Sequence, residues 1–256
     1  MFSDTCVGIV VPTLGRRQDY LRLCVESIRA AGQVHLCIVA PEESGLRSLV
    51  TEGVVDQFVV DSGNGLADAI NQGIKSMPEK IKFANWLGDD DLLEPGSIEL
   101  TRSYLEKEKS SVMVFGRCAY IDSSGKLIFE NRSGQWAVAL MHFGPQMVSQ
   151  PGALFRRGVF EELNGLDVNY KWAFDLEFFL RLSKIGKLSY VPFRVSSFRW
   201  HSESLSVGGR KGSVQEASFI RRKFLPAPIR IFSGIWEAPI RNLILRVGNR
   251  VSKISS

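Results

Sequence analysis

The sequence predicts an α/β fold: a mostly parallel sheet flanked by helices, followed by a smaller β-hairpin region and a C-terminal helical tail. Three observations lead to this prediction. Short β-branched runs alternate with amphipathic runs in the first half of the chain. Hairpin signals replace that alternation in the second half. Apolar residues recur at every third or fourth position near the C-terminus.

The first half alternates at the pitch of strand–helix–strand units. Apolar, β-branched runs predict strands at residues 7–13, 34–39, 57–60 and 83–87. The runs between them have helical spacing at residues 19–31 and 66–74. Because each helix returns the chain to the same end of the sheet, these strands are expected to be parallel.

The second half has a different character. A turn signal at 122–125 (DSSG) separates expected strands at 112–120 and 127–129, which is typical of a hairpin. Helices are expected at 157–163 and 175–185, and strands at 188–191 and 195–200. The glycine-rich stretch at 208–212 predicts a flexible loop.

Composition limits the function classes. The chain has 256 residues, 45% of them hydrophobic, which is enough for one substantial core. The net charge of +5 comes from residues 221–256, which hold eight basic residues and one acid, whereas the rest carries a slight negative charge. A nucleic-acid partner is therefore not expected.

The cysteines and the hydropathy pattern indicate a compartment. The four cysteines show no paired spacing, which indicates a reducing environment and no disulfide framework. The N-terminus lacks secretory-signal features, and no apolar run reaches the ~18 residues that span a bilayer. We expect a cytoplasmic protein.

Three adjacent carboxylates are the strongest chemical feature. Asp89, Asp90 and Asp91 follow the fourth expected strand, and residues 12–16 and 40–44 follow the first two. Ligands bind beyond the carboxyl ends of such strands. Adjacent carboxylates repel one another unless a cation neutralises them, and Mg²⁺ or Mn²⁺ held there would clamp a diphosphate. The alternative is a solvated acidic turn that caps a helix starting near Pro95.

Six motifs in the same order resemble glycosyltransferase family 2, a family of the GT-A fold that includes bacterial enzymes of polysaccharide biosynthesis. They lie at residues 10–16, 64–73, 85–96, 150–156, 174–182 and 199–206. Each motif is weak alone, but the ordered set is fairly specific. The resemblance implies two halves in a domain at 1–212: a nucleotide-sugar-binding half at 1–115 and an acceptor-binding half at 116–212. A basic amphipathic tail would occupy 213–256.

The resemblance also implies a chemistry. It is that of a metal-dependent inverting transferase, which moves a sugar from a nucleotide-diphosphate sugar, with UDP-sugar favoured, to an acceptor hydroxyl. A lipid-linked or polysaccharide-precursor glycan would be the acceptor, and Mn²⁺ or Mg²⁺ the cofactor. The expected general base is Asp175. The other expected site residues are Pro12, Thr13, Arg16, Glu42, Asn71, Asp89 and Asp90 for the nucleotide-sugar; Gln150, Trp172 and Glu177 for the acceptor or sugar; and Asp90, Asp91 and His201 for the metal.

Several assignments have structural alternatives. The sequence departs from the family at residues 39–41, where relatives carry an acidic residue that Glu42 would have to replace. Asp175 is also a candidate N-cap of the helix that it begins. His201 is open to a structural role, and Trp172 and Trp200 to burial in the core. Arg210 and Lys211 are candidates either for a lid over the diphosphate or for an exposed charged loop.

The tail has a basic amphipathic pattern. Apolar residues recur from Ile229 to Ile254 between arginines, and Pro228 and Pro239 suit the first turns of two short helices. Residues 228–254 would contact a membrane surface, the protein's own body or a second subunit. Basic charge favours peripheral attachment at the inner face of the plasma membrane.

Two other function classes remain open at this point. A sugar nucleotidyltransferase shares the α/β core and metal carboxylates, but it usually opens with a glycine-rich loop that residues 13–17 do not match. A non-catalytic nucleotide-sugar-binding protein would not need a base at Asp175. Release of nucleoside diphosphate rather than pyrophosphate would distinguish a glycosyltransferase from a nucleotidyltransferase. An Asp175→Asn variant that keeps binding and loses transfer would distinguish an enzyme from a binding protein.

Overall fold

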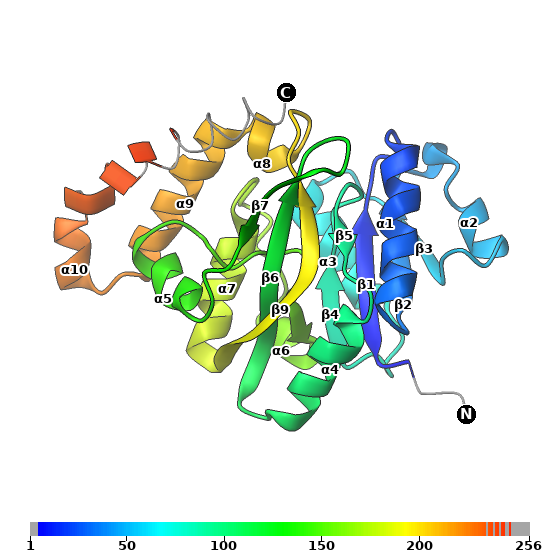
Figure 1. The fold of residues 1–256 in the computed structure, drawn as a ribbon, viewed down its shortest axis with the longest axis horizontal. Coiled ribbons are helices and arrows are strands. Elements are labelled where there is room, and N and C mark those ends of the chain that lie inside the picture. The colour runs from blue at the N-terminus through cyan, green and yellow to red at the C-terminus, as the bar shows by residue number, and fades with distance from the viewer. Residues whose placement is uncertain (1–4, 234, 238, 241, 244–245, 247–256) are drawn as a thin grey trace.

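The computed structural model describes residues 5–233, 235–237, 239–240, 242–243 and 246. Within them, nine strands form one twisted sheet in the order β3-β2-β1-β4-β8-β6-β9-β5, with β7 paired to β6. Helices cover both faces of the sheet, and the last helices extend past the end opposite to β3 (Figure 1).

The first half contains the predicted parallel sheet. The strands are β1 (Val7–Pro12), β2 (His35–Ala40), β3 (Gln57–Val60) and β4 (Phe83–Trp86), and all their pairings with one another are parallel. Helices α1 (Gln18–Ala31) and α3 (Leu66–Ser76) make the crossovers. Helix α3 approaches β1 closely at Gly73, where a Cβ would lie 2.6 Å from Cγ1 of Val10.

Short elements link this sheet to the rest. They are η1 (Glu42–Ser44), α2 (Ser48–Thr51), β5 (Leu92–Leu93) and α4 (Ser97–Lys107). Helix α4 is the helix that the sequence predicts near Pro95. Strand β5 pairs antiparallel with a strand from the second half, which fixes the segment after β4 between the two halves.

The second half adds β6 (Ser111–Ile121), β7 (Leu127–Asn131), β8 (Leu154–Arg156) and β9 (Lys187–Arg199). The β6–β7 hairpin confirms the predicted turn. The two strands expected at 188–191 and 195–200 are one strand, β9, because the ladder with β6 continues past Pro192 through a register shift. Proline has no N–H to donate, so an irregular register there costs little.

The remaining helices are α5 (Trp136–Phe143), α6 (Arg157–Glu162), α7 (Phe174–Ile185), α8 (Leu205–Gly208), α9 (Arg210–Phe224) and α10 (Ala227–Phe232). The expected boundaries between the two halves and before the tail fall inside secondary-structure elements. Residue 115 lies within β6, and residue 212 lies within α9. Pro228 lies in the first turn of α10, as predicted. The part of the tail stripe at 247–254 lies outside the described residues.

The loop predicted at 208–212 is wrong, since α8 ends there and α9 begins. The glycines allow a close contact rather than flexibility. A Cβ on Gly209 would lie 2.2 Å from Nε1 of Trp172, and one on Gly212 would lie 2.7 Å from the same ring. The Trp172 ring therefore packs directly on the start of α9.

The core has one apolar cluster on each face of the sheet. Successive β1 residues alternate between them: Val7, Ile9 and Val11 join the cluster under α1, and Val10 joins the other. That second cluster holds Trp86 and a group of phenylalanines from β8, α6 and α7. The cysteines are all unpaired. Among the described residues, no helix is both long and apolar enough to cross a lipid bilayer.

Candidate active site

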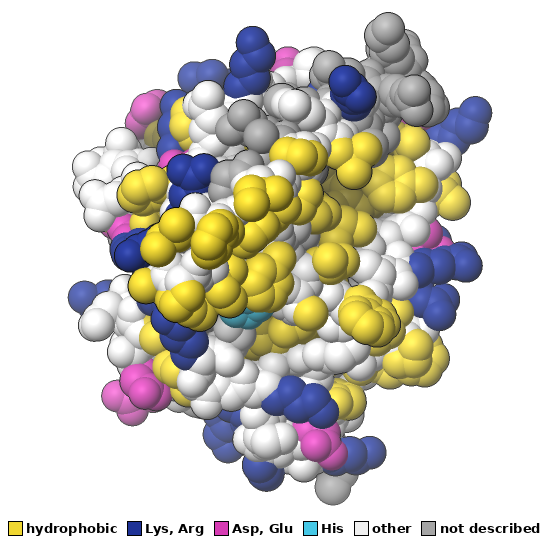
Figure 2. Space-filling model, turned by 90° about the vertical axis from the view of Figure 1, so that its left-hand side faces the viewer, with side chains coloured by type: hydrophobic (Ala, Val, Ile, Leu, Met, Phe, Trp, Pro, Cys, Tyr) yellow, Lys and Arg dark blue, Asp and Glu magenta, His cyan; other side chains and the backbone are white. Residues whose placement is uncertain are grey.

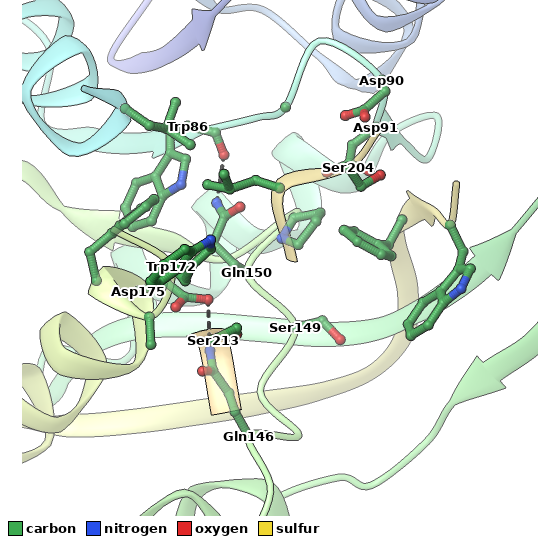
Figure 3. Close-up of a pocket in the computed structure, with 18 of the residues that line it drawn as sticks. Trp86, Asp90, Asp91, Gln146, Ser149, Gln150, Trp172, Asp175, Ser204 and Ser213 are labelled. Atoms are coloured by element: carbon green, nitrogen blue, oxygen red, sulfur yellow. Dashed lines mark hydrogen bonds between the residues drawn. The ribbon is translucent and has the colours of Figure 1, made fainter. Parts of the chain in front are cut away.

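A cavity of about 1420 Å³ opens at the carboxyl ends of β1 and β4, between the two halves of the sheet. Its volume exceeds that of a usual single-ligand pocket, which is ~300–1,000 Å³. Its wall contains the acidic trio at one side and α7 and α9 at another (Figure 3). The residues that line it come mainly from 12–17, 86–91, 145–151, 172–175, 198–205 and 210–221.

The acidic trio forms a buried turn directly after β4. Residue Leu87 still donates to the carbonyl of Val10 at 2.9 Å, so the turn begins at the edge of the parallel sheet. Oγ1 of Thr13 donates to Asp89 Oδ2 at 2.5 Å. The backbone N–H of Arg199 donates to Asp91 Oδ1 at 2.9 Å. Asp89 and Asp91 are thus held by residues at the ends of β1 and β9. All three carboxylates are buried, so the solvated acidic turn proposed as an alternative is not what the structure contains.

Arg17 supplies positive charge to this turn, and sequence reasoning missed it. Its Nη1 donates to Asp90 Oδ2 at 2.8 Å, and its Nη2 pairs with Asp89 Oδ1. Nε2 of His201 lies 2.7 Å from the same Asp90 oxygen and 3.2 Å from Arg17 Nη1. The residues Thr13, Asp89, Asp90 and His201 are therefore brought together, with Arg17 between them.

Burial is the largest single influence on the pKa values of the acidic trio. Burial raises the pKa of Asp89. Burial and the neighbouring Asp90 charge raise the pKa of Asp91 well above its usual range. Burial also opposes ionisation of Asp90, but the His201 hydrogen bond and the Arg17 charge outweigh it and lower the Asp90 pKa. Since carboxylates with raised pKa values gain from an added cation, this turn is suited to binding one.

The donor types of the turn fit a hard divalent cation. A Cβ on Gly88 would lie 2.8 Å from Asp90 Oδ1 and 3.1 Å from Asp91 Oδ2, so two carboxylate oxygens converge over this glycine. Carboxylate oxygens are the ligands that Mg²⁺ and Mn²⁺ prefer. Within the described part of the chain, no group of three or more His, Cys, Asp or Glu residues converges in metal-ligand geometry. Arg17 neutralises two of the carboxylates in this structure.

Asp175 lies across the cavity at the start of α7 (Figure 3). Gln146 Nε2 donates to its Oδ2 at 2.9 Å, and the backbone N–H of Leu176 donates to its Oδ1 at 2.7 Å. The N-cap of α7 is Ala173, so the alternative role of Asp175 as N-cap is wrong. Burial raises the pKa of Asp175 to about 6, against hydrogen bonds that lower it. A carboxylate with this pKa is a competent base near neutral pH.

Gln150 and Trp172 also line the cavity. Gln150 Nε2 donates to the carbonyl of Trp86 at 2.6 Å, which holds its side chain at the end of β4. The backbone N–H of Trp172 donates to Glu216 of α9 at 2.7 Å. The Trp172 ring packs on the start of α9 and lines the cavity. Trp200 and Arg210 lie in the wall as well, and the guanidinium of Arg210 stands 5.4 Å from the Trp200 ring centre.

Three predicted site residues lie outside the cavity wall. Glu42 is exposed on η1 and pairs with Arg47 at 2.5 Å. Asn71 exchanges two hydrogen bonds with the backbone of Leu166 and so ties α3 to the loop before α7. Glu177 is buried and pairs with Arg181 at 2.7 Å. The contacts of Asn71 and Glu177 stabilise the fold, whereas the Glu42–Arg47 ion pair lies on the surface and contributes little.

Two further acidic residues line the cavity without having been predicted: Asp61 and Glu203. Asp61 follows β3 directly, and its N–H donates to the carbonyl of Ala40 at 2.9 Å. An acid at the carboxyl end of a parallel strand is the signal that identified Asp89, and it applies equally to Asp61. Pro12 and Arg16, which were predicted, lie in the same wall.

The chain resembles known proteins in sequence and in fold. The sequence model of glycosyl transferase family 2 matches residues 8–163. A curated relative from Rickettsia bellii, named an uncharacterized glycosyltransferase, is 22% identical in an alignment of 235 residues that covers 86% of this chain. The chain spans 33% of the length of that relative.

Two solved structures share the fold. Staphylococcus aureus TarS 1–349 in complex with UDP-GlcNAc has a TM-score of 0.62 at 12% identity, over 89% of this chain and 72% of its own. The mannosyltransferase PcManGT from Pyrobaculum calidifontis was solved in complex with GDP-Man and Mn²⁺. It has a TM-score of 0.62 at 12% identity, over 97% of this chain and 76% of its own. These likenesses confirm the predicted GT-A fold. With the family match over more than half of its length, the chain belongs to glycosyltransferase family 2.

Proposed function

We propose that the protein is a metal-dependent inverting glycosyltransferase, which moves a sugar from a nucleotide-diphosphate sugar to an acceptor hydroxyl. One observation carries the proposal: a buried acidic turn and a carboxyl with a pKa of about 6 face the same cavity from different elements. Family membership supports the sugar-transfer chemistry.

The donor would lie at the carboxyl ends of β1, β3 and β4. Pro12, Thr13 and Arg16 would contact the nucleotide, and Asp61 takes the place that we predicted for Glu42. TarS was solved with UDP and with UDP-GlcNAc, and PcManGT with GDP-Man. We favour a UDP-sugar, with residues 1–115 as the donor half and 116–212 as the acceptor half.

Asp89, Asp90 and Asp91 would hold Mn²⁺ or Mg²⁺, with His201 beside Asp90. When bound, the cation supplies positive charge to the diphosphate that leaves. PcManGT was solved with Mn²⁺, which supports a divalent cofactor here. Thr13 and the Arg199 backbone orient the outer carboxylates of the trio.

Asp175 would act as the general base. It accepts the proton of the acceptor hydroxyl while that oxygen forms a bond to the anomeric carbon, and the bond from that carbon to the diphosphate oxygen breaks in the same displacement. A single displacement inverts the configuration at that carbon. Gln146 keeps the Asp175 carboxylate oriented. Gln150 and Trp172 would contact the sugars.

The acceptor is proposed to be a glycan precursor linked to a lipid. Apolar side chains from the loop before β8, from α9 and from the tail line part of the cavity beside polar ones: Met147, Val214, Ala217 and Leu243. This apolar part suits an alkyl chain better than a free sugar. A Val214→Glu variant should therefore raise KM for an acceptor with an octyl aglycone and leave KM for the same glycan without it unchanged.

We also propose that the face formed by α5, α9 and α10 rests on an anionic membrane surface. Figure 2 shows hydrophobic side chains gathered there among basic ones. Trp136 of α5 and Ile231 and Phe232 of α10 are 78%, 79% and 61% exposed. Large exposed apolar patches mark interaction sites, and basic residues add attraction to anionic lipids. The attachment would be at the inner face of the plasma membrane.

Vesicle flotation tests the membrane proposal. The protein should float with phosphatidylglycerol vesicles, and an Ile231→Glu/Phe232→Glu variant should stay at the bottom of the gradient. A Val60→Glu variant, which changes an exposed valine at the other end of the sheet, is the matched control and should float. The membrane proposal would be wrong if the wild-type protein did not bind vesicles but sedimented as a dimer, and the variant sedimented as a monomer. Residues 228–254 would then contact a second subunit instead.

The function itself is tested by a thermal-shift screen of nucleotide-sugars with and without Mn²⁺. A ligand that binds only the folded state raises the melting temperature. We expect one nucleotide-sugar to do so strongly only when Mn²⁺ is present. Turnover with the donor found should release nucleoside diphosphate. Release of pyrophosphate would instead identify a nucleotidyltransferase, and equal shifts without metal would contradict the role of the acidic trio.

A further inference from the structure

The acidic turn already contains a cation of its own, the guanidinium of Arg17. The side chains of Asp89 and Asp90 are 6% and 11% exposed, and Arg17 pairs with both. With Asp91, the turn carries up to three negative charges in a buried position. Two like charges so close to one another are stable only when positive charge offsets them. Arg17 therefore does in this structure what a bound metal would do.

A second arginine beside the acidic turn, Arg199, is held by contacts that cannot be exchanged. Arg199 is 2% exposed, and its guanidinium donates to the backbone carbonyls of Asp90, Asp122 and Ser123 at 2.9–3.1 Å. Backbone carbonyls cannot move away without deforming the acidic turn and the turn after β6. Arg199 is thus a fixed part of the fold, and its positive charge stays beside Asp91.

Arg17 is held differently. Its hydrogen bonds run to two side-chain carboxylates and to the ring of His201, and its own side chain is 27% exposed at the cavity wall. Its backbone is anchored, because its carbonyl accepts the Leu21 N–H at 2.9 Å in the first turn of α1. The guanidinium can consequently leave the carboxylates by side-chain rotation alone, without unfolding of α1.

The geometry points to Arg17 as an exchangeable cation that occupies the carboxylates before the donor site is loaded and gives way to the divalent cation. Arg17 and the metal would compete for oxygens of Asp89 and Asp90. This inference rests on the metal site of the proposed function. It adds a positioning role for Arg17: the residue keeps the turn folded without metal and sets how tightly the metal binds.

Metal titration of variants tests the exchange without any turnover. Mn²⁺ binding in the absence of nucleotide is measured by calorimetry and by the EPR signal of free Mn²⁺. Removing a competitor tightens binding, so Arg17→Met should bind Mn²⁺ at least about tenfold more tightly than wild type. The matched control is Arg22→Met at an arginine of α1 that lies outside the cavity wall and pairs with Glu26. Its Mn²⁺ affinity should equal that of wild type.

The melting temperature of the metal-free protein provides a second test, and it should fall in the variant whose Mn²⁺ affinity rises. Without metal, Arg17→Met should melt at a lower temperature than wild type, because the carboxylates lose their cation. Saturating Mn²⁺ should remove most of that difference. If Arg17→Met fails to fold without metal, Arg17→Lys keeps the charge but lacks the forked donors that bridge two carboxylates. It should bind Mn²⁺ with an affinity between those of wild type and Arg17→Met.

The guanidinium can also be followed directly. NMR of protein with ¹⁵N-labelled arginine detects the Nη signals of Arg17, which are assigned by their loss in Arg17→Lys. These signals should change during a titration with Mg²⁺, at the concentration at which Mg²⁺ binds. Equal Mn²⁺ affinities for wild type and Arg17→Met, or Arg17 signals that do not respond to bound Mg²⁺, would overturn the exchange and leave the proposed function standing. Failure of Mn²⁺ to bind any variant would overturn the metal site of the proposed function itself.

Discussion

Replacing Asp175 by asparagine should stabilise the protein and abolish turnover. Burial raises the pKa of Asp175 from 3.8 to about 6. An acid whose pKa is higher in the folded state destabilises the fold when it ionises. This destabilisation grows as pH rises from the unfolded pKa and is complete above the folded pKa. At pH 8 the full difference corresponds to about 3 kcal/mol, at ~1.4 kcal/mol per pKa unit.

The expected gain is smaller than this limit. The residue as a whole is half-buried, because it faces the cavity. Asparagine can keep the Leu176 contact, and the amide of Gln146 can turn to accept from it. We therefore expect Asp175→Asn to gain about 1–3 kcal/mol at pH 8, or roughly 3–10 °C in Tm for a chain of this length. At pH 4 the gain should vanish, since the aspartate is then protonated.

Calorimetry at pH 4, 6 and 8 measures the stability, and release of nucleoside diphosphate measures turnover. Loss of a general base costs about 10²–10⁴-fold in rate. Nucleotide-sugar binding should remain, which separates an enzyme from a binding protein. A Tm gain that is the same at pH 4 and pH 8, or no gain at all, would refute the reasoning that burial holds the Asp175 carboxyl in an unfavourable ionised state.

Three other predictions concern neighbouring residues. For wild type, kcat/KM should fall about tenfold per pH unit below pH 6, as Asp175 takes up its proton, and stay level above it; a profile flat from pH 4.5 to 8 would exclude Asp175 as the base. Glu177→Gln leaves the Arg181 guanidinium without its buried partner, so urea denaturation should show that the free energy of unfolding falls by about 3 kcal/mol. Turnover per folded molecule should be unchanged. A loss of turnover would instead place Glu177 in the acceptor site. Gly88→Ala places a Cβ 2.8 Å from Asp90 Oδ1, so calorimetry should find weaker Mn²⁺ binding at an unchanged Tm, and unchanged binding would place the metal elsewhere.

The strands and the acidic turn were predictable because local pattern and tertiary position coincide there. The run from Val7 to Val11 is apolar throughout, as a strand buried on both faces must be. The acidic trio follows such a strand at once. By contrast, α5 has apolar residues on all sides and no capping residue, so neither periodicity nor a helix signal identified it.

The ion pairs of the charged residues depend on contacts that sequence cannot reveal. Arg16 and Arg17 are adjacent and both line the cavity, but only the structure shows that Arg17 is the one that pairs with the carboxylates. Glu42 and Glu177 were assigned by their places in motifs, but Arg47 and Arg181 take up their charges. The pairing partner of a charged residue is set by the fold, and the motif alone cannot supply it.

The central claim is that a cation joins the acidic turn to the donor's phosphates. Pulsed EPR of Mn²⁺ bound to the protein with UDP measures this through the coupling of the metal to ³¹P. We expect a strong ³¹P coupling in wild type, and its loss in Asp91→Asn. Mn²⁺ that binds without ³¹P coupling, or a coupling that persists in Asp91→Asn, would contradict the claim.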